Sequence, residues 1–360
     1  MTTQNEKRMV IAVASDDNYA IPMYVMLFSL LANLDSSYFC DINILTSGDF
    51  SERNLSIINT LEQKFIKCKL VFHNMAQKYQ DAPISNDYNH VTIQTYYRLN
   101  LSSLLPDEDR CLYLDVDIIV NADISALYET DLDGYYVAGV KNAWFCWPAG
   151  EGNLHKNRLC INNSDTYINA GVSLFNLKAI RADDIEKKYI ELTDKQYDYM
   201  DQDILNIICF GKIKIIPLKF NFFARYARFG AETYDKTEYL PCAYSRDEFL
   251  EAIEKPIIIH YANKSKPWKK IKVEFSEIWW DYLFRCVDDK SIFYEYLCSV
   301  MNSGRKALIR YETQIKELND SIALQECELD TLFSSHSYRI GHFITALPRK
   351  IRLILNRRIT

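Results

Sequence analysis

The stretch Arg110-Cys-Leu-Tyr-Leu-Asp-Val-Asp-Ile-Ile-Val120 is an apolar run that two carboxylates, Asp115 and Asp117, interrupt. Its leucine, isoleucine, valine and tyrosine side chains favour a strand that is buried on both faces. Residues two apart on a strand point to the same side, so these aspartates would repel each other and lose hydration. They predict either a divalent metal ion at the end of the strand or a strand terminus whose acids face water.

The composition predicts a globular protein with a sizeable core. The chain has 360 residues, 48% of them hydrophobic, which suits one large domain or two smaller ones. The net charge of -6 argues against nucleic-acid binding through electrostatics. Ten scattered cysteines, without a Cys-x-x-Cys pair, indicate a reducing compartment. No stretch has the pattern of a signal peptide or a membrane span, and we expect a cytoplasmic protein.

Strands and helices alternate in the N-terminal part. Strands are expected at Met9–Ala14, Ile42–Thr46 and Lys69–His73, and helices at Ile21–Leu34 and from Ser51 to about Phe65. This order predicts an α/β sheet with right-handed crossovers, whose ligands bind beyond the carboxyl ends of the strands. The loop after the first strand contains Asp16, Asn18 and Tyr19 but no glycine-rich fingerprint, which disfavours a dinucleotide-binding Rossmann site and a P-loop.

The central part of the chain continues this pattern. Helices are expected at Thr92–Asn100, Lys178–Thr193, Met200–Asn206 and Phe275–Met301, and strands at Tyr136–Val140, Ile168–Asn176 and Pro256–Tyr261. Asn121-Ala-Asp123 is expected to cap a short helix, and Ala143–Asp165 to form a loop that covers a site. Arg98 is either an ordinary surface arginine or one that contacts phosphate or sugar.

The C-terminal part predicts association with other surfaces. Apolar residues recur at spacings of three and four, which predicts a coiled-coil-like helix over 305–333 and homo-oligomers through 308–332; the seam is Leu308, Tyr311, Ile315, Leu318, Ile322, Gln325, Leu329 and Leu332. The tail, 334–360, has no acidic residue and interleaves basic with large apolar side chains. Such a segment favours an anionic membrane surface, at about 1 kcal/mol per basic residue near the headgroups, over a solvated tail.

Four groups of polar residues are expected to meet at the strand ends: the loop after the first strand, the Asp115 and Asp117 pair, Asn169–Gly171 with Asp201 and Gln202, and His260 with Lys266. Alone, His260 would be an ordinary core or surface histidine. With the two carboxylates it completes an oxygen and nitrogen site that suits Mn²⁺, with Mg²⁺ as the other candidate.

These motifs resemble glycosyltransferase family 8, the group that includes bacterial lipooligosaccharide galactosyltransferases and glycogenin. The matching stretches run in order over residues 8 to 270: Ala14-Ser-Asp-Asp-Asn-Tyr19, Thr95-Tyr-Tyr-Arg98, Leu112-Tyr-Leu-Asp-Val-Asp117, Ile168-Asn-Ala-Gly-Val172, Asp201-Gln-Asp-Ile-Leu-Asn206, Phe220-Asn-Phe222 and His260-Tyr-x-x-x-x-Lys-Pro-Trp268. The resemblance implies a GT-A fold, which is a mixed, mostly parallel sheet flanked by helices. It also implies transfer of a hexose from a UDP-sugar with retention of the anomeric configuration.

The resemblance also implies roles for individual residues. The donor is expected to contact Ala14, Asp16, Asn18, Tyr19, Arg98, Asp115, Val116, Asn169, Ala170 and Lys266. Within this set, Asp16, Asn18 and Tyr19 would hold uracil and ribose, and Lys266 the diphosphate. The metal ligands would be Asp115, Asp117 and His260. The candidate catalytic residues are Gln202, near the anomeric carbon, and Asp201.

The sequence departs from the family pattern at two positions. Asn142 stands where the family often has an acid, and Asn263 stands where it usually has glycine. Asparagine tolerates a left-handed backbone better than most residues. Retention by double displacement needs a carboxylate nucleophile, and the Gln202 amide is a poor one. We therefore favour front-face attack, with Asp201 as the candidate nucleophile of a covalent alternative.

The expected function is hexose transfer from UDP-glucose or UDP-galactose to a glycan or lipid-linked acceptor in lipopolysaccharide, capsule or other cell-surface polysaccharide synthesis. Residues 1–270 would form the catalytic domain and 271–304 a helical extension. The protein would lie on the inner face of the cell membrane. A non-catalytic nucleotide-sugar-binding scaffold is the alternative. A haloacid-dehalogenase-type phosphatase ranks below it because its Asp-x-Asp lies near the N-terminus, and a sugar nucleotidyltransferase would need a glycine-rich, arginine-containing loop.

Overall fold

The computed structural model describes residues 7–84, 92–161 and 167–334. The chain divides into two compact units, Met1–Leu297 and Cys298–Thr360. All described strands belong to the first unit: β1 Lys7–Ala14, β2 Tyr38–Thr46, β3 Cys68–Asn74, β4 Arg110–Leu114, β5 Ile118–Val120, β6 Val137–Lys141, β7 Ile168–Asn176, β8 Ile213–Ile215, β9 Phe222–Phe223 and β10 Ile258–His260.

The strands form two sheets. The larger has the order β3-β2-β1-β4-β7-β6-β8 and the smaller the order β5-β10-β9. In the larger sheet β7 is antiparallel to β4 and β6, while the other neighbouring strands are parallel. This confirms the expected mixed, mostly parallel GT-A sheet.

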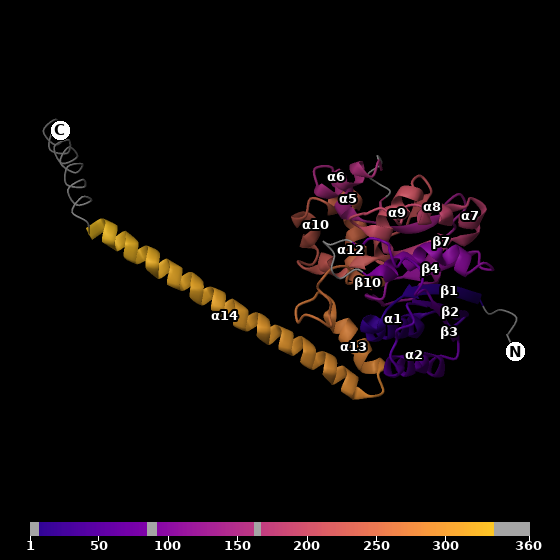
Figure 1. Cartoon of the computed structure of the whole chain (residues 1–360), viewed down its shortest axis with the longest axis horizontal. Coiled ribbons are helices and arrows are strands. Elements are labelled where there is room, and N and C mark those ends of the chain that lie inside the picture. Colours follow the sequence, from indigo (N-terminus) through magenta and orange to yellow (C-terminus); the bar gives the residue numbers. More distant parts are fainter. Residues whose placement is uncertain (1–6, 85–91, 162–166, 335–360) are drawn as a thin grey trace. The chain divides into compact units, whose positions relative to one another are not determined.

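Strand β1 shows why both faces of the sheet are apolar. Met9, Ile11 and Val13 face a core shared with α1, α2 and α13, whereas Val10 and Ala12 face a second core. The alternation follows from the two-residue period of a strand. Residues of α7, α8 and α9 complete the second core, and Figure 1 shows these helices beside β7, with α1, α2 and α13 on the other side of β1.

The described helices are short, except for the last. They are α1 Ala20–Asn33, α2 Glu52–Lys64, α3 Leu101–Leu104, α4 Ser125–Tyr128, α5 Ala143–Cys146, α6 Glu151–Arg158, α7 Leu177–Ala182, α8 Ile185–Ile190, α9 Met200–Ile208, α10 Glu232–Lys236, α11 Leu240–Ala243, α12 Arg246–Glu254, α13 Ser276–Cys286 and α14 Lys290–Ser334. The 3₁₀ helices are η1 Asp17–Tyr19, η2 Ile93–Asn100, η4 Leu218–Phe220 and η5 Ala224–Ala227.

The prediction of one continuous strand over Arg110–Val120 is wrong, because the segment forms two strands, β4 and β5. The chain leaves the larger sheet after β4, turns through residues 115–117, and enters the smaller sheet as β5, antiparallel to β10. The backbone N–H of Asp115 donates to the carbonyl of Gly171 at 2.7 Å, which holds this turn beside β7. The turn brings both carboxylates to the wall of a cavity, because burial inside a strand ladder would leave them without partners.

Other expected elements differ in detail. The segment Ala143–Asp165 was expected to be a loop, but its described part contains α5 and α6, because Phe145 and Ile161 pack with Tyr167 in a small core. The helix expected over Lys178–Thr193 is interrupted by Asp184, whose φ is 52°. The helix expected over Phe275–Met301 is divided between α13 and α14. Helix α4 begins after Ile124, and Oδ1 of Asp123 accepts from the backbone N–H of Ser125 at 3.3 Å, so the expected cap lies one residue further from the helix start.

The described part of the second unit is helical. The coiled-coil-like segment expected over 305–333 lies within α14, and its Ile322 and Leu329 side chains are exposed. Its self-association stays a prediction. The expected membrane-associating tail lies outside the described residues beyond Ser334. Across residues 7–84, 92–161 and 167–334, no helix combines the length and apolarity that crossing a membrane requires.

Candidate active site

A cavity of about 650 Å³ lies at the carboxyl ends of β1 and β4. Its wall contains most residues that the sequence singled out: Ala14, Asp16, Tyr19, Arg98, Asp115, Val116, Asp117, Asn169, Ala170, Asp201, Gln202, His260 and Lys266. Asn18 is instead exposed on η1, so its predicted contact with the nucleotide stays a prediction. The cavity also has aromatic and basic walls that the sequence did not single out, including Trp144, Tyr199 and Arg225.

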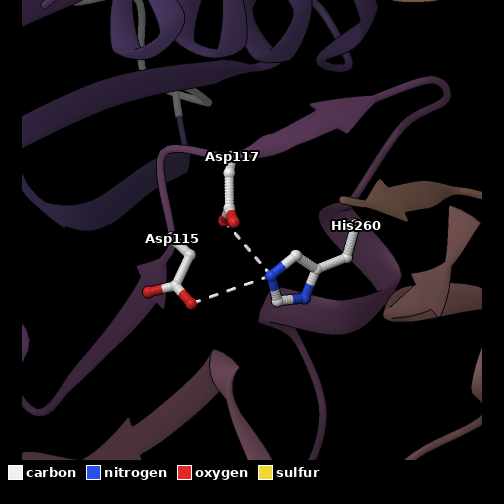
Figure 2. Close-up of side chains that lie close together, drawn as sticks. All are labelled: Asp115, Asp117 and His260. Carbon is white, nitrogen blue, oxygen red and sulfur yellow. Dashed lines mark ion pairs between the residues drawn. The ribbon is translucent and has the colours of Figure 1, made fainter. Parts of the chain in front are cut away.

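Three side chains form a candidate metal centre at this cavity. Asp115, Asp117 and His260 each offer one ligand atom, and these atoms lie within 4.8 Å of one another. The aspartates come from the turn after β4 and the histidine from the end of β10 (Figure 2). Nε2 of His260 lies 3.2 Å from Oδ1 of Asp117 and 3.8 Å from Oδ2 of Asp115.

The chemistry of these atoms fits a divalent cation. Nδ1 of His260 lies 2.8 Å from the amide oxygen of Asn221, which only accepts hydrogen bonds, so Nδ1 carries a hydrogen. Nε2 then faces the two carboxylates and is the nitrogen that would bind a metal ion held between them. Two carboxylate oxygens and an imidazole nitrogen are ligands that suit Mn²⁺ and related ions.

Gly171 leaves room for this centre. A Cβ atom at Gly171 would lie 2.4 Å from Cε1 of His260 and 2.5 Å from Oδ2 of Asp115. Both distances are shorter than real Cβ contacts, so any other residue at position 171 would force His260 or Asp115 to shift, and glycine permits the close approach of β7 to the two ligands. The backbone of β7 as well as side chains therefore packs against the candidate metal centre.

Arg98 is a buried arginine that forms ion pairs with two carboxylates, rather than a surface arginine. Its side chain is 3% exposed, Nη2 lies 2.9 Å from Oδ1 of Asp115, and Nε lies 2.9 Å from Oδ2 of Asp201. Nη1 donates to the carbonyl of Ala170 at 2.6 Å, and the guanidinium lies 4.1 Å from the ring centroid of Tyr113. One planar guanidinium therefore connects the metal centre, the start of α9 and strand β7.

Lys266 and Asp201, two further charged residues of the cavity wall, are also buried. Lys266 is 2% exposed, forms an ion pair with Asp117 and donates to the carbonyl of Tyr261 at 2.7 Å. Burial alone would raise the pKa of Asp117, but the charges of Lys266 and His260 and their hydrogen bonds hold it well below its usual range. Burial raises the pKa of Asp201 to about 6, against the opposing charge of Arg98. Asp117 and Asp201 are thus carboxylates of the cavity wall that are each paired with a buried cation.

Gln202 is held by hydrogen bonds on both sides of its amide. Its oxygen accepts from Nδ2 of Asn169 at 2.9 Å and from the backbone N–H of Ala170 at 3.2 Å, and its nitrogen donates to Oη of Tyr167 at 3.2 Å. Sequence reasoning missed Tyr167 and gave Asn221 no role, although Asn221 lies in the quoted Phe220-Asn-Phe222 stretch. The Phe220-Asn-Phe222 motif could have pointed to Asn221, whereas no motif quoted from the sequence contains Tyr167.

A mixed sheet with an Asp-x-Asp turn and a histidine at a cavity beyond its strand ends defines a glycosyltransferase of the GT-A type. The chain belongs to glycosyl transferase family 8, whose family model matches residues 10–272.

Several relatives support this assignment. The chain is 31% identical over 221 residues to glycosyltransferase GlyE of Streptococcus pneumoniae, covering 60% of this chain and 46% of the relative, which is less than half its length. It is 26% identical over 268 residues to the lipopolysaccharide 1,2-glucosyltransferase of Escherichia coli, covering 72% of each. The crystal structure of galactosyltransferase LgtC, in complex with donor and acceptor sugar analogs, has a TM-score of 0.61 and 27% identity, covering 77% of this chain and 96% of that one.

Proposed function

We propose that the protein transfers a hexose, glucose or galactose, from a UDP-sugar to a glycan or lipid-linked acceptor with retention of the anomeric configuration. The observation that carries this proposal is the convergence of Asp115, Asp117 and His260 on one cavity with Lys266 and Gln202. The similarity to a lipopolysaccharide glucosyltransferase and to a galactosyltransferase supports the same class of donor and acceptor.

The metal centre would serve the departing diphosphate. Asp115, Asp117 and His260 would hold Mn²⁺ or Mg²⁺, and a bound divalent ion supplies positive charge that stabilises the leaving phosphate oxygens. Lys266 is already desolvated beside this position and adds a fixed positive charge, which acts strongly where water is excluded. The turn residue Val116 lies between the two aspartates and would contact the donor together with Asp115.

The nucleoside would occupy the end of the cavity next to β1. Ala14, Asp16 and Tyr19 line this end, and Asn18 would join them. The ring of Tyr19 packs edge-on against Trp268 with centroids 5.9 Å apart, and Nζ of Lys269 lies 5.3 Å from the centroid of the Tyr19 ring. These contacts orient the tyrosine ring, which supports a role in holding uracil and ribose.

The donor sugar would lie between Arg98, Asn169, Ala170, Asp201 and Gln202. Asp201 is paired with Arg98 inside the protein, so its carboxylate is less available as a nucleophile. This pairing supports front-face attack, in which the Gln202 amide lies beside the anomeric carbon and the acceptor approaches on the side of the leaving group. A covalent intermediate on Asp201 is the alternative within this proposal.

The expected location is cytoplasmic and peripheral, on the inner face of the cell membrane. The tail 334–360 would bind anionic lipid, and residues 308–332 would form homo-oligomers.

A non-catalytic nucleotide-sugar-binding scaffold is the second candidate function, and a phosphatase ranks below it. The presence of Asp115, Asp117, His260 and Gln202 on one cavity favours the enzyme, because a scaffold has no need of a desolvated cluster of charges.

A panel of UDP-sugars tests the proposal without knowledge of the acceptor. The purified full-length protein would be incubated with each UDP-sugar and Mn²⁺, and slow donor hydrolysis would be measured as released UDP. Release from UDP-glucose or UDP-galactose identifies the donor. Mn²⁺-dependent binding of UDP without release from any donor would contradict the enzyme and support the scaffold.

A further inference from the structure

A continuous series of buried and partly buried hydrogen bonds connects the candidate metal centre with the Asp203 carboxylate, which contacts His155 of α6. Its links are His260 Nδ1 to Asn221 Oδ1 at 2.8 Å, Asn221 Nδ2 to Asn169 Oδ1 at 2.9 Å, Asn169 Nδ2 to Gln202 Oε1 at 2.9 Å, Gln202 Nε2 to Tyr167 Oη at 3.2 Å and Tyr167 Oη to Asp203 Oδ1 at 2.5 Å. The series therefore includes a candidate metal ligand at one end and a candidate catalytic amide in its middle.

The direction of every link follows from groups that have only one role. The Asp203 carboxylate only accepts, so Tyr167 donates to it and must accept from Gln202. The backbone N–H of Ala170 only donates, and it lies 3.2 Å from Oε1 of Gln202, which fixes the same orientation of this amide independently. The amide of Gln202 therefore has one orientation that satisfies both neighbours.

The same reasoning extends to the metal centre. The backbone N–H of Gly171 donates to Oδ1 of Asn169 at 3.1 Å, so Nδ2 of Asn169 faces Gln202. Oδ1 of Asn169 also accepts from Nδ2 of Asn221, which leaves Oδ1 of Asn221 to accept from His260. The histidine thus carries its hydrogen on Nδ1 and turns Nε2 toward Asp115 and Asp117.

Asp203 is anchored strongly enough to terminate the series. Its side chain is fully buried, Nε2 of His155 lies 2.9 Å and 3.0 Å from its two oxygens, and the backbone N–H of Tyr199 donates to Oδ2 at 3.0 Å. Nδ1 of His155 in turn lies 2.9 Å from Oδ2 of Asp198. A buried carboxylate with this many donors keeps its acceptor role, because losing it would leave several donors unpaired.

We propose that Asn221, Tyr167 and Asp203 are positioning residues, whose directed hydrogen bonds hold His260 as the metal-binding tautomer and Gln202 with its carbonyl oxygen toward β7. The part that concerns His260 rests on the geometry of the metal centre alone. The part that concerns Gln202 rests on the proposed function. The two parts are therefore tested by different measurements.

Mn²⁺ binding by the full-length protein, without donor, tests the part that concerns His260. Free Mn²⁺ would be measured by electron paramagnetic resonance for the wild type, Asn221→Ala and Asn43→Ala. Asn43, on β2, is a matched control because its side chain is buried and its Oδ1 lies 2.8 Å from Nε2 of His73, on β3. Loss of an outer hydrogen bond to a metal-binding histidine lowers affinity by about 10- to 100-fold, so we expect this loss in Asn221→Ala only. Equal affinities of the two variants would overturn this part.

Asn221→Asp covers the case in which Asn221→Ala does not fold. The aspartate keeps an acceptor for Nδ1 of His260 but has no donor for Asn169. We expect Mn²⁺ affinity close to that of the wild type together with reduced turnover of the donor. A loss of Mn²⁺ affinity as large as that expected for Asn221→Ala would show that the acceptor at Nδ1 does not hold the tautomer, and would overturn the assignment.

Turnover tests the part that concerns Gln202. Tyr167→Phe removes the acceptor for Nε2 of Gln202 and leaves a buried donor unpaired, which we expect to lower kcat by about tenfold with little change in Mn²⁺ affinity. Tyr189→Phe is the matched control, because Tyr189 is also buried and its Oη lies 2.9 Å from the Cys209 thiol, away from Gln202. Equal kcat values for the two variants would overturn this part. If the wild type released UDP from no donor, the proposed function would fail, while the comparison of Mn²⁺ affinities would still decide the part that concerns His260.

Discussion

Nε of Arg98 lies 2.9 Å from Oδ2 of Asp201, with both side chains almost fully excluded from solvent. The same guanidinium binds Asp115 through Nη2, also at 2.9 Å. The start of α9, which carries the candidate catalytic residues, is therefore tied to the turn that carries the candidate metal ligands. A single cation neutralises carboxylates on both sides of the proposed donor site, so Arg98 contributes to the stability of the fold as well as to the site.

Arg98→Met tests this structural role. Removing one partner of a buried ion pair leaves uncompensated charge, which we expect to lower the free energy of unfolding by about 3–5 kcal/mol. Arg53→Met is the control, because Arg53 pairs with Glu295 at an exposed site where such pairs contribute about 0–1 kcal/mol. Urea unfolding measures both values. A similar loss in the two variants would contradict the role assigned to Arg98.

Gly171→Ala tests the close packing around the candidate metal centre without changing any ligand. The added Cβ would meet Cε1 of His260 and Oδ2 of Asp115 at 2.4 Å and 2.5 Å, so the ligands must move apart. We expect Mn²⁺ affinity to fall by about tenfold or more, as when the support of metal ligands is removed. Circular dichroism would confirm folding. Unchanged affinity in a folded variant would show that the metal lies elsewhere.

His155 predicts a pH-dependent contribution to stability. Burial lowers its pKa, but the hydrogen bond and charge of Asp203, with the charge of Asp198, outweigh burial and leave the pKa raised. The folded protein keeps this proton to a higher pH than the unfolded chain. The contribution is therefore fully present below the unfolded pKa of about 6.5 and is lost as the pH rises through the folded pKa.

His155→Gln and His73→Gln make this prediction measurable. The stability lost in His155→Gln should shrink as the pH rises above about 6.5. His73 is the opposite case, because burial lowers its pKa, and the stability lost in His73→Gln should instead shrink as the pH falls. Urea unfolding at several pH values gives both trends. The same trend in both variants would contradict the charge assigned to His155.

The tail predicts membrane binding that depends on charge. Full-length protein should sediment with vesicles that contain anionic lipid and much less with neutral vesicles, because its basic residues contribute about 1 kcal/mol each near the headgroups. Truncation after Ser334 should abolish sedimentation and leave UDP release unchanged. Equal sedimentation of the full-length and truncated proteins would contradict a role of the tail.

The sequence predicted those elements whose pattern is local. The apolar run Met9–Ala14 forms the end of β1, and Ile21–Leu34 coincides closely with α1, because each buries its own apolar residues in the core. The division of Arg110–Val120 was not predictable in this way. Ile118, Ile119 and Val120 continue the apolar pattern of β4, and they join the smaller sheet only because β10, far along the chain, pairs with them.

The candidate site shows the same limit. Asp115, Asp117, His260 and Gln202 were found because they lie in ordered motifs at strand ends and a helix start. Tyr167 and His155 were not, because their roles depend on a partner from α9 that only tertiary packing supplies. Arg98 was expected to contact ligand or solvent, and its burial between two carboxylates follows from the position of η2 against α9 and the turn after β4.

The most direct test of the account is the metal dependence of UDP release from the donor that the panel identifies. Asp117→Asn removes a charged ligand, and Asp133→Asn, at an exposed turn, is the control. We expect UDP release by the wild type and the control to require Mn²⁺ or Mg²⁺, and release by Asp117→Asn to be lost. Release by the wild type that persists in the presence of a chelator and in Asp117→Asn would contradict the metal centre on which the proposed function depends.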